Sequence, residues 1–493
     1  MNRRGFINNM QLAGIGLILF PKLASGNNKI HCSSTLLKLT APKTLPVPEG
    51  KRVAFNWPAF GIAPGETIIV KPKNKLPNEN LWIRVSVAQE IRDEKSLIVS
   101  IPETNTRLGK IDILFSSVLV PYELEIDGKY AEQISKNGLE LKLESPSPLW
   151  IFNEQAAGVN NHAFLPHIIS SSEKTGTVDQ FLNCFTSVNS VQAFGWREGT
   201  VLDGLWQLYA QKNNKQAKKA IDEHLDLFFD RQNLNYEDGR SNPKQNEVDG
   251  IESTIPFATL ARINPSHPIL KTVVEGWQKL KKPNGMIIDG TMVSAEGCYT
   301  VAYPLAVIGK QWNDKNLMDE AMGQLKHRFV LYNNNSLYLR YYTEGRYTYQ
   351  NWARGAAWNL LGFARTISEL KDVRQDDEVN AKFQEGVKLA VSMQRTDGLW
   401  SCFMHRHEIL PDTGGSAGIA AAILTGIELG LVPDSYRVHA EKCWDELQNY
   451  ISPDGFLRGV AQDNRAGEKL QESDYRVIAQ MGMGLMAQLF AEL

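Results

Sequence analysis

The hydrophobic pattern of this chain changes its period near residue 150, and this change limits the folds open to it. Before that point, runs such as "LWIRVSV" and "SLIVSIP" alternate or stay apolar for about five to seven residues, between turn sequences such as "LPNEN" and "DGK". After "ESPSPLWIFN", apolar residues recur at helical spacing, as in "REGTVLDGLWQLYAQ". The sequence therefore predicts an antiparallel β-sandwich domain over residues 35–152 and a mostly α-helical domain over residues 176–493.

A helix–turn–helix pattern recurs through the second domain. Its pairs begin, at spacings of roughly 45 to 60 residues, near Trp196, Asp249, Glu296, Trp352, Gly414 and Asp474. Each pair opens with an apolar helix rich in Gly and Ala and continues with a more polar helix, as expected when first helices are buried and second helices face solvent. Six pairs, with one helix supplied by the segment before Trp196, predict an (α/α)6 barrel. An open helical solenoid is the alternative.

The first residues have the pattern of an export signal. Arg3 and Arg4 precede the apolar run "LAGIGLILF", and "LASG" supplies small residues suited to cleavage. Residues 1–26 therefore indicate a signal peptide of the twin-arginine type, with an amphipathic first helix as the alternative. The apolar run is too short to span a bilayer. We expect an exported protein, periplasmic or secreted, without a membrane span.

Composition narrows the classes of function. The 53 Lys and Arg nearly balance the 55 Asp and Glu, so no basic surface is expected for nucleic acid. The five Cys are scattered without a CxxC spacing, which indicates buried free thiols and no metal site. The 11 Trp and 15 Tyr include flat amphipathic rings of the kind that suit carbohydrate faces.

Carboxylates recur where the first helix of a pair begins, often beside Trp, Tyr or Arg. In a closed ring these helix starts gather at one end, so residues distant in sequence meet there. Two carboxyl groups in one crevice can have their pKa values driven apart, which leaves one of them protonated as a general acid. A single such carboxylate is better explained as a helix cap than as a catalytic group. Recurrence beside Trp and Arg favours a catalytic site.

Four stretches together resemble a known group of enzymes. "NWARGAAWNLLGFA" contains the W-x-R-G-x-x-W pattern of the unsaturated glucuronyl and rhamnogalacturonyl hydrolases, glycoside hydrolase families 88 and 105. "WREGTVLDGLWQLY", "DTGGSAGIAAAI" and "DGFLRGVAQ…MGMGLMAQLF" follow the order and spacing of that group. The resemblance covers about residues 180–493. Some Bacteroidetes-type members of the group carry an extra N-terminal β-domain, which is similar to the layout here.

The resemblance implies an (α/α)6 barrel that acts on oligosaccharides made by polysaccharide lyases. An acid protonates C4 of a terminal 4,5-unsaturated uronic acid, water adds at C5, and the hemiketal opens to release the neighbouring sugar, without metal or cofactor. Of the two family aspartates, one maps onto Asp249. The other falls by order and spacing on Glu296, which departs from the family pattern. Asp289 is the fallback for that role.

The resemblance also implies a substrate-binding set. Trp352 and Trp358 would wall the sugar subsites, and Arg354 would face the uronate carboxylate or orient a catalytic carboxylate. Trp196 and Tyr299 are further stacking candidates. The alternative for Trp358 and Arg354 is helix packing and an ion pair with a structural Asp.

Two other functions fit the residues. The Glu at position 296 is compatible with an inverting hydrolase of saturated glycosides on the same barrel, and the aromatic residues with a non-catalytic carbohydrate-binding protein. The sequence does not specify the sugar beyond the scissile bond, the role of the β-domain or the oligomeric state.

Overall fold

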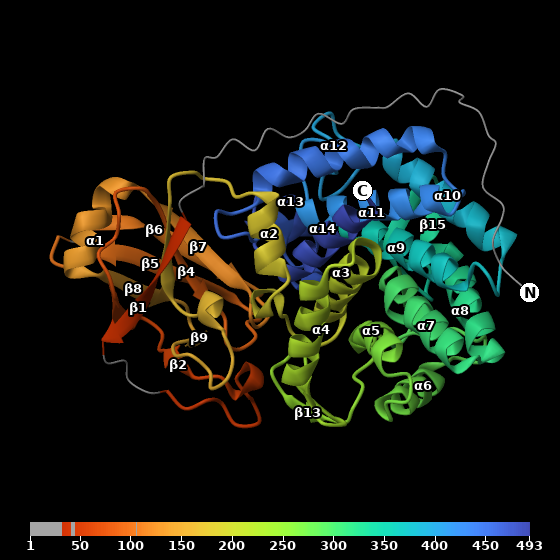
Figure 1. The fold of residues 1–493 in the computed structure, drawn as a ribbon, viewed down its shortest axis with the longest axis horizontal. Coiled ribbons are helices and arrows are strands. Elements are labelled where there is room, and N and C mark those ends of the chain that lie inside the picture. The colour runs from red at the N-terminus through yellow and green to blue at the C-terminus, as the bar shows by residue number, and fades with distance from the viewer. Residues whose placement is uncertain (1–31, 41–44, 105) are drawn as a thin grey trace, which may run out of the picture.

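The computed structural model describes residues 32–40, 45–104 and 106–493. The expected signal peptide, residues 1–26, lies outside the described residues. Two parts lie side by side in Figure 1, a sheet region in red and orange at the left and a larger helical region coloured yellow to blue. A mostly helical chain with an N-terminal antiparallel sheet was expected, and the structure confirms it.

The sheet region is built around an eight-stranded sheet with the order β6-β5-β8-β3-β1-β10-β4-β7. All neighbouring strands are antiparallel. A two-stranded sheet, β2-β9, accompanies it. The strand bounds are β1 Cys32–Thr40, β2 Ala59–Ile62, β3 Thr67–Pro72, β4 Asn80–Ser86, β5 Glu94–Ile101, β6 Thr106–Leu114, β7 Pro121–Ile126, β8 Leu139–Glu144, β9 Leu149–Phe152 and β10 His167–Ser171. One short helix, α1 (Ala131–Asn137), precedes β8.

Strand pairing and burial explain how this region holds together. In β5, Lys95, Leu97, Val99 and Ile101 are buried and alternate with less buried residues, as the period-2 pattern predicts. β1 pairs with β10 in its first half and with β3 in its second half. Because β10 follows residue 152 in sequence, the sheet also takes in a strand from the segment that leads to the helices.

Six helices of the helical region form a closed cycle of contacts. Each packs on the next, and the final one, α14, packs on both α11 and α3. The cycle consists of α3 (Trp196–Lys212), α5 (Pro256–Ile263), α7 (Tyr303–Trp312), α9 (Ala353–Leu370), α11 (Thr413–Glu428) and α14 (Gln480–Glu492). Because α14 contacts α3, the helices form an α-helical barrel, and an open solenoid does not describe them.

A second set of helices packs outside this cycle. Each contacts at least one helix of the inner cycle, and α8, α10 and α12 each contact two neighbouring inner helices. The outer set is α2 (Val178–Phe185), α4 (Lys215–Phe228), α6 (Ile269–Leu280), α8 (Lys315–His327), α10 (Asp377–Val391) and α12 (Arg437–Leu447). As expected, α2 comes from the segment before Trp196 and packs on α14. The sixth inner helix begins at Gln480, later than the expected start near Asp474, because β19 (Arg476–Val477) intervenes.

Short β-elements connect an outer helix to the next inner helix. They are β11 (Phe229–Asp230), β12 (Asn233–Glu237), β13 (Pro243–Gln245), β14 (Met292–Ser294), β15 (Tyr332–Asn333), β16 (Ser336–Tyr342), β17 (Tyr347–Gln350) and β18 (Val460–Ala461), which pairs with β19. A short helix, α13 (Glu468–Glu472), lies between β18 and β19. These connections carry several of the side chains described below.

Small residues let the inner helices approach one another closely. A Cβ added at Gly204 of α3 would lie 2.5 Å from the carbonyl oxygen of Gly484 in α14. A Cβ at Gly362 of α9 would lie 2.3 Å from the backbone of Cys298. Real side chains cannot occupy these positions without moving the neighbouring backbone. The Gly- and Ala-rich composition of the first helices is therefore a packing requirement of the barrel.

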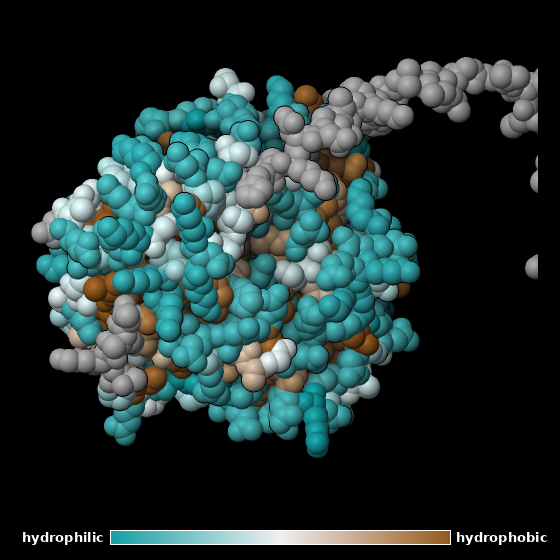
Figure 2. Space-filling model, turned by 60° about the vertical axis from the view of Figure 1, so that its left-hand side comes forward, coloured by the Kyte–Doolittle hydropathy of each residue, from teal (hydrophilic) through white to brown (hydrophobic). Residues whose placement is uncertain are grey.

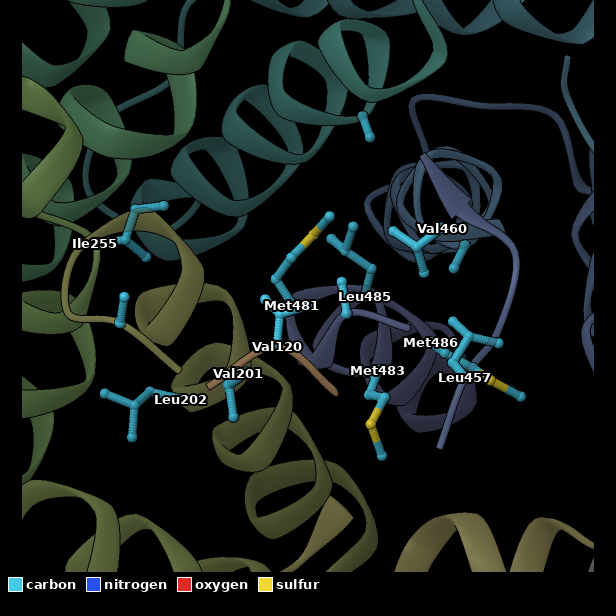
Figure 3. Close-up of a cluster of buried hydrophobic side chains, with 14 of the residues drawn as sticks. Val120, Val201, Leu202, Ile255, Leu457, Val460, Met481, Met483, Leu485 and Met486 are labelled. Carbon is cyan, nitrogen blue, oxygen red and sulfur yellow. The ribbon is translucent and has the colours of Figure 1, made fainter. Parts of the chain in front are cut away.

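The sheet region and the barrel share one hydrophobic core and several polar contacts. Figure 3 draws Val120 of the sheet region with Val201 of α3 and Met481 of α14 in one buried cluster. Arg84 of β4, which is fully buried, pairs with Glu123 at 2.6 Å and with Asp454 of the helical region. The two parts are thus joined by apolar packing and by a buried ion pair.

The surface is mainly polar. Hydrophilic residues cover most of the face in Figure 2, and hydrophobic residues are scattered over it. None of the described helices is long and apolar enough to cross a membrane. All five Cys are free, and four of them are buried, as the sequence predicts.

Candidate active site

The starts of four inner helices meet around one cleft. Its inner pocket, with a volume of about 290 Å³, is lined by side chains from the starts of α3, α9 and the segments before α5 and α7. An outer pocket of about 240 Å³ adjoins it. Trp196, Arg197, Glu252 and Arg465 line both pockets. The expectation that helix starts gather at one end is met by these four segments.

The expected catalytic carboxylates lie in adjoining parts of this cleft. Glu296 lines the inner pocket and Asp249 lines the outer pocket. Between them is Glu252, which lines both. Asp289 lies beside Asp249, where its Oδ2 accepts a hydrogen bond from the Ile251 amide at 3.3 Å. Asp289 therefore braces the loop before α5, while Glu252 is the carboxyl group that both parts of the cleft share.

Charge and burial raise the pKa values of the carboxyl groups in the inner pocket. Desolvation by the surrounding protein, then the negative charges of Glu296 and Asp289, raise the pKa of Glu252 to about 7, against the lowering effect of Arg197 and Arg340. Desolvation also raises the pKa of Glu296, with Arg340 opposing it. Two acidic groups that share a crevice cannot both ionise freely. The pair therefore holds a proton to higher pH than free glutamates do.

Three of the expected aromatic residues border the cleft. Trp352 and Trp358 line the inner pocket, and Trp196 lines both pockets. The rings of Trp196 and Trp358 meet edge to face with centroids 5.6 Å apart. The guanidinium of Arg197 lies 4.3 Å from the ring centroid of Trp196. Together they form an indole wall with a cation on one side.

Tyr299 lies outside the cleft, contrary to its expected stacking role. It is fully buried in the π-helix Cys298–Ala302 and lines neither pocket. Its hydroxyl donates to Asp203 Oδ2 at 2.5 Å, and its ring stacks on Trp358 with centroids 5.9 Å apart. Burial and the charge of Asp203 raise the pKa of Tyr299. Tyr299 thus supports Trp358 from behind.

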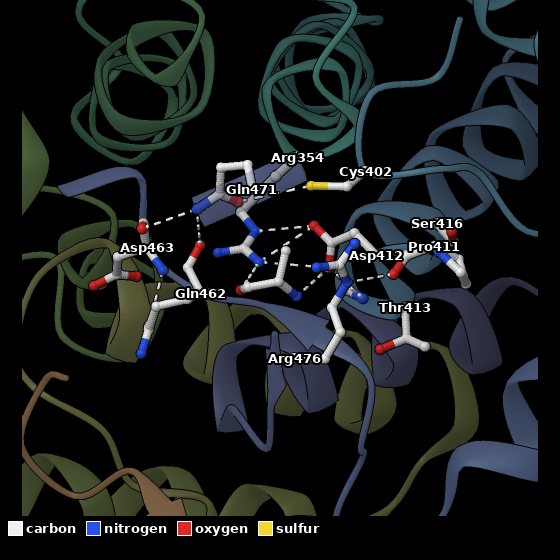
Figure 4. A network of polar contacts seen from close by, with 12 residues as sticks. Arg354, Cys402, Pro411, Asp412, Thr413, Ser416, Gln462, Asp463, Gln471 and Arg476 are labelled. Atoms are coloured by element: carbon white, nitrogen blue, oxygen red, sulfur yellow. Dashed lines mark hydrogen bonds and ion pairs between the residues drawn. The ribbon is translucent and has the colours of Figure 1, made fainter. Parts of the chain in front are cut away.

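Arg354 is held by a buried network (Figure 4). Its guanidinium pairs with Asp412 at 3.2 Å and donates to the carbonyl oxygen of Ala461. Asp412 in turn accepts hydrogen bonds from the amides of Gly414 and Ala461 at 3.2 and 3.0 Å, which caps α11. Both side chains are at most 1% exposed. Arg354 lines the inner pocket while paired with a structural carboxylate, the alternative that the sequence left open.

Arg340 of β16 is the inner-pocket cation with the fewest partners. Its Nε is buried and has no hydrogen-bond partner among the described residues. Its guanidinium lies 5.6 Å from the ring centroid of Tyr349. By contrast, Arg197 pairs with Asp463, and Arg465 pairs with Glu90. Arg340 is therefore free to bind an anionic group that enters the pocket.

The segment before α9 is locally strained. Tyr349 and Asn351 adopt left-handed backbone conformations, with φ of 57° and 51°. Such angles are unfavourable for a bulky residue and persist only where surrounding contacts fix them. Here the Asn351 Oδ1 accepts from the Leu337 amide at 2.9 Å, and the Tyr349 hydroxyl donates to the Asn464 carbonyl at 2.9 Å. These contacts hold Trp352, the N-cap of α9, at the pocket.

Sequence reasoning missed Glu252 and Arg340. Glu252 stands three residues after Asp249 in "VDGIES", within the same expected helix start, so proximity to that start was the available signal. Arg340 lies in a strand far from any helix start, and only the pairing of β16 with β14 and β17 brings it to the cleft.

Carboxyl groups of raised pKa lie here between indole rings and guanidinium groups, an arrangement suited to the acid–base cleavage of a glycoside. The sequence profile of glycosyl hydrolase family 88 matches residues 171–493, and the chain belongs to this family. No curated protein matches the chain in sequence. The resemblance found in the sequence motifs is thereby confirmed.

Solved structures show the same fold. A possible member of glycoside hydrolase family 105 from Salmonella enterica aligns with a TM-score of 0.54 at 20% identity, over 62% of this chain and 83% of its own. A family 105 glycoside hydrolase from C. acetobutylicum gives 0.53 at 19% identity, over 64% and 97%. A glycosyl hydrolase family 88 protein from Bacteroides vulgatus gives 0.50 at 17%, over 64% and 98%. The similarity is thus to the helical barrel.

Proposed function

We propose that this protein releases a terminal 4,5-unsaturated uronic acid from oligosaccharides made by polysaccharide lyases. The proposal takes the helical region as an (α/α)6 barrel, the sheet region as a β-sandwich, and residues 1–26 as a signal for export. One observation carries it: Glu252 and Glu296 line one pocket, and burial raises the pKa of both. A carboxyl group that stays protonated near neutral pH is what protonation of a carbon–carbon double bond requires.

In the proposed mechanism the two glutamates divide the proton transfers. Glu252, with a pKa of about 7, donates its proton to C4. Glu296, whose ionised form Arg340 favours, accepts a proton from the water that adds at C5. C4 thus gains hydrogen and C5 gains hydroxyl, and the resulting hemiketal opens to release the neighbouring sugar. The pair finishes with its protons exchanged and returns to the starting state through solvent.

The cleft also offers groups to hold the substrate. Arg340 would bind the carboxylate of the unsaturated sugar, because its Nε lacks a partner among the described residues. Trp196 and Trp358 would cover the faces of the ring. Asp249, in the outer pocket, would contact the leaving sugar. Tyr299, which lies outside the cleft, has no contact with the substrate in this arrangement. The proton donor is assigned to Glu252.

A second candidate is an inverting hydrolase of saturated glycosides. The observation that favours it is Glu296, a glutamate where the resemblance implies an aspartate. In that case Glu252 would protonate the glycosidic oxygen and Glu296 would activate water at the anomeric carbon. Product analysis on saturated oligosaccharides separates the two reactions, because only the hydration reaction consumes a double bond.

The test is the ultraviolet absorbance of the unsaturated uronate, which disappears when its double bond is hydrated. Lyase-made disaccharides from pectic, glycosaminoglycan and ulvan-type polymers should include one that the protein bleaches. The absence of bleaching across this panel, with cleavage of saturated oligosaccharides, would establish the second candidate instead.

Variants test the assigned roles. Glu252→Gln and Glu296→Gln should each lower turnover by about a hundredfold to ten-thousandfold, because each removes a proton-transfer group. Asp249→Asn should lower turnover less than either. Glu247→Gln is the matched control, since Glu247 is an exposed carboxylate of the same segment that lines neither pocket. Equal activity of Glu252→Gln and Glu247→Gln would refute the role of Glu252.

A further inference from the structure

A third pocket adjoins the outer pocket on the side of the sheet region. Its volume is about 520 Å³, and Arg92 and Arg240 line both it and the outer pocket. Most of its other lining residues belong to the sheet region, among them Lys51, Gln89 and Trp150. We call it the distal pocket. Since neighbouring pockets share residues in each case, the inner, outer and distal pockets follow one another along a single groove.

The charges of the distal pocket are not balanced. Its two carboxylates already have partners: Glu90 pairs with Arg92 at 3.1 Å and with Arg465, and Asp93 pairs with Lys95 at 3.0 Å. After these pairs are formed, two cationic side chains of the pocket have no carboxylate partner among its lining residues.

Lys51 and Arg240 are those cations. Among the described residues, the Lys51 ammonium donates only to neutral acceptors, the carbonyl oxygen of Arg240 at 2.7 Å and Asn242 Oδ1 at 2.8 Å. The Arg240 guanidinium forms no hydrogen bond or ion pair within the described part of the chain. Two positive charges without carboxylate partners on one wall attract an anionic group.

A buried amide, that of Gln89, also belongs to this wall. Gln89 is only 6% exposed, and its Nε2 has no hydrogen-bond partner among the described residues. Leaving a buried amide donor without an acceptor is unfavourable unless a ligand or water supplies one. Trp150 lines the same pocket and offers part of an indole ring. Cation, amide donor and indole together suit a sugar that carries a carboxylate or sulfate.

We propose that the distal pocket is a binding subsite for an anionic sugar of a longer oligosaccharide whose end is processed in the inner pocket. The sheet region thus selects substrates by length and charge. The inference rests on the proposed function for the nature of the ligand. Its observations, the shared pocket residues and the unbalanced cations, are independent of which bond is cleaved.

Binding measurements on an inactive protein test this without turnover. Unsaturated disaccharides and tetrasaccharides from pectic, glycosaminoglycan and ulvan-type lyase digests are titrated calorimetrically into the Glu296→Gln protein. At least one tetrasaccharide should bind more tightly than its disaccharide. Adding Lys51→Ala and Gln89→Leu together should reduce the ratio of tetrasaccharide to disaccharide affinity by about tenfold, as the loss of a charge-assisted contact implies.

Controls separate this effect from others. Lys129→Ala removes an exposed ammonium of the same region that lines none of the three pockets, and it should leave the ratio unchanged. Thermal denaturation confirms that each variant is folded. If no tetrasaccharide of the panel binds more tightly than its disaccharide, or if the substitutions weaken both lengths equally, the inference is overturned. Length-dependent binding without bleaching of any substrate would refute the proposed reaction and leave the distal subsite standing.

Discussion

Arg340 acts on the charge of both the proposed acid and the proposed base, and Arg197 also lowers the pKa of Glu252. The Arg340 guanidinium lowers the pKa of both Glu252 and Glu296, against the opposite effect of burial. The same side chain has a buried Nε without a partner among the described residues. One cation therefore has two effects in the pocket: it tunes the glutamate pair and attracts the substrate anion.

Replacing this cation should shift the pH profile. In Arg340→Gln the ionised forms of both glutamates lose a stabilising charge, so their pKa values rise. Activity is lost as pH rises through the pKa of the proton donor, about 7 for Glu252. The alkaline limb of kcat/KM should therefore move to higher pH, with a lower maximum from the lost carboxylate contact.

The matched control for this shift is Arg346→Gln. Arg346 is an exposed arginine that follows the same strand, and it pairs with Glu344 at 3.4 Å outside the cleft. Its removal should leave the limb in place. A limb that stays fixed or moves to lower pH in Arg340→Gln would contradict the assigned electrostatics.

For individual residues, the sequence predicted which helix starts form the site more accurately than which side chains line it. Their positions relative to the expected helix starts indicate Asp249 and Glu296, and these two residues do line adjoining pockets. Position along the chain does not show which of several carboxylates near one helix start faces the pocket, so Glu252 was missed. Nor can it show that Tyr299 faces Asp203, because that contact joins two helices.

At the scale of elements, glycines set the distance between α3 and α14. Gly204→Ala should lower stability by about 1–3 kcal/mol, because the added methyl meets the Gly484 carbonyl oxygen. Gly276→Ala is the matched control. Gly276 lies within α6, and a methyl added there would meet no atom within 4 Å beyond its chain neighbours and the nearby backbone of its own helix, so Ala should stabilise by about 0.5–1 kcal/mol through helix propensity.

Thermal denaturation of the two variants measures this difference. The melting temperature of Gly204→Ala should fall below that of the natural protein, and that of Gly276→Ala should equal or exceed it. Equal melting temperatures for both variants would show that the α3–α14 contact relaxes without cost.

The helix pairs could be predicted because their apolar residues recur with the helical period. α11, for instance, is buried along nearly its whole length, and its sequence "TGGSAGIAAAILTGIE" is apolar on all sides. The short β-elements could not be predicted, because strands of two to seven residues have too few positions for an alternating pattern to be recognised. Because β19 was not predicted, α14 begins later in the sequence than expected.

For the whole molecule, the ion pair of Arg84 joins the sheet region to the barrel. Arg84→Ala would leave Asp454 and Glu123 without their buried partner, which should cost about 3–5 kcal/mol. Arg107→Ala is the control, because Arg107 is exposed on β6. Comparable melting temperatures for the two variants would contradict a structural role for the pair.

The effect of pH on this variant follows from Asp454. Burial acts to raise the pKa of Asp454, and Arg84 outweighs it, so the pKa lies below its ordinary value of 3.8. A carboxylate with a depressed pKa stabilises the fold above its ordinary pKa, and this stabilisation is lost as pH falls through the folded value. The difference in melting temperature between the natural protein and Arg84→Ala should therefore shrink below about pH 4.

The change of hydrophobic period predicted the division into a sheet region and a helical region. It did not predict which residues of the two regions contact each other. β10 pairs with both β1 and β4, strands that precede it by about eighty residues or more. No local pattern in "HIISS" specifies those partners. The same holds for Lys51 and Arg240, which meet only because the two regions are joined.

The contact of α14 with α3 has a consequence for how the chain reaches this structure. These helices occupy residues 196–212 and 480–492, so the cycle closes across almost the entire helical sequence. During synthesis, the apolar face of α3 that packs on α14 stays uncovered until α14 has been synthesised. High contact order of this kind slows folding and prolongs exposure to aggregation. We expect chaperone dependence to concentrate in that interval.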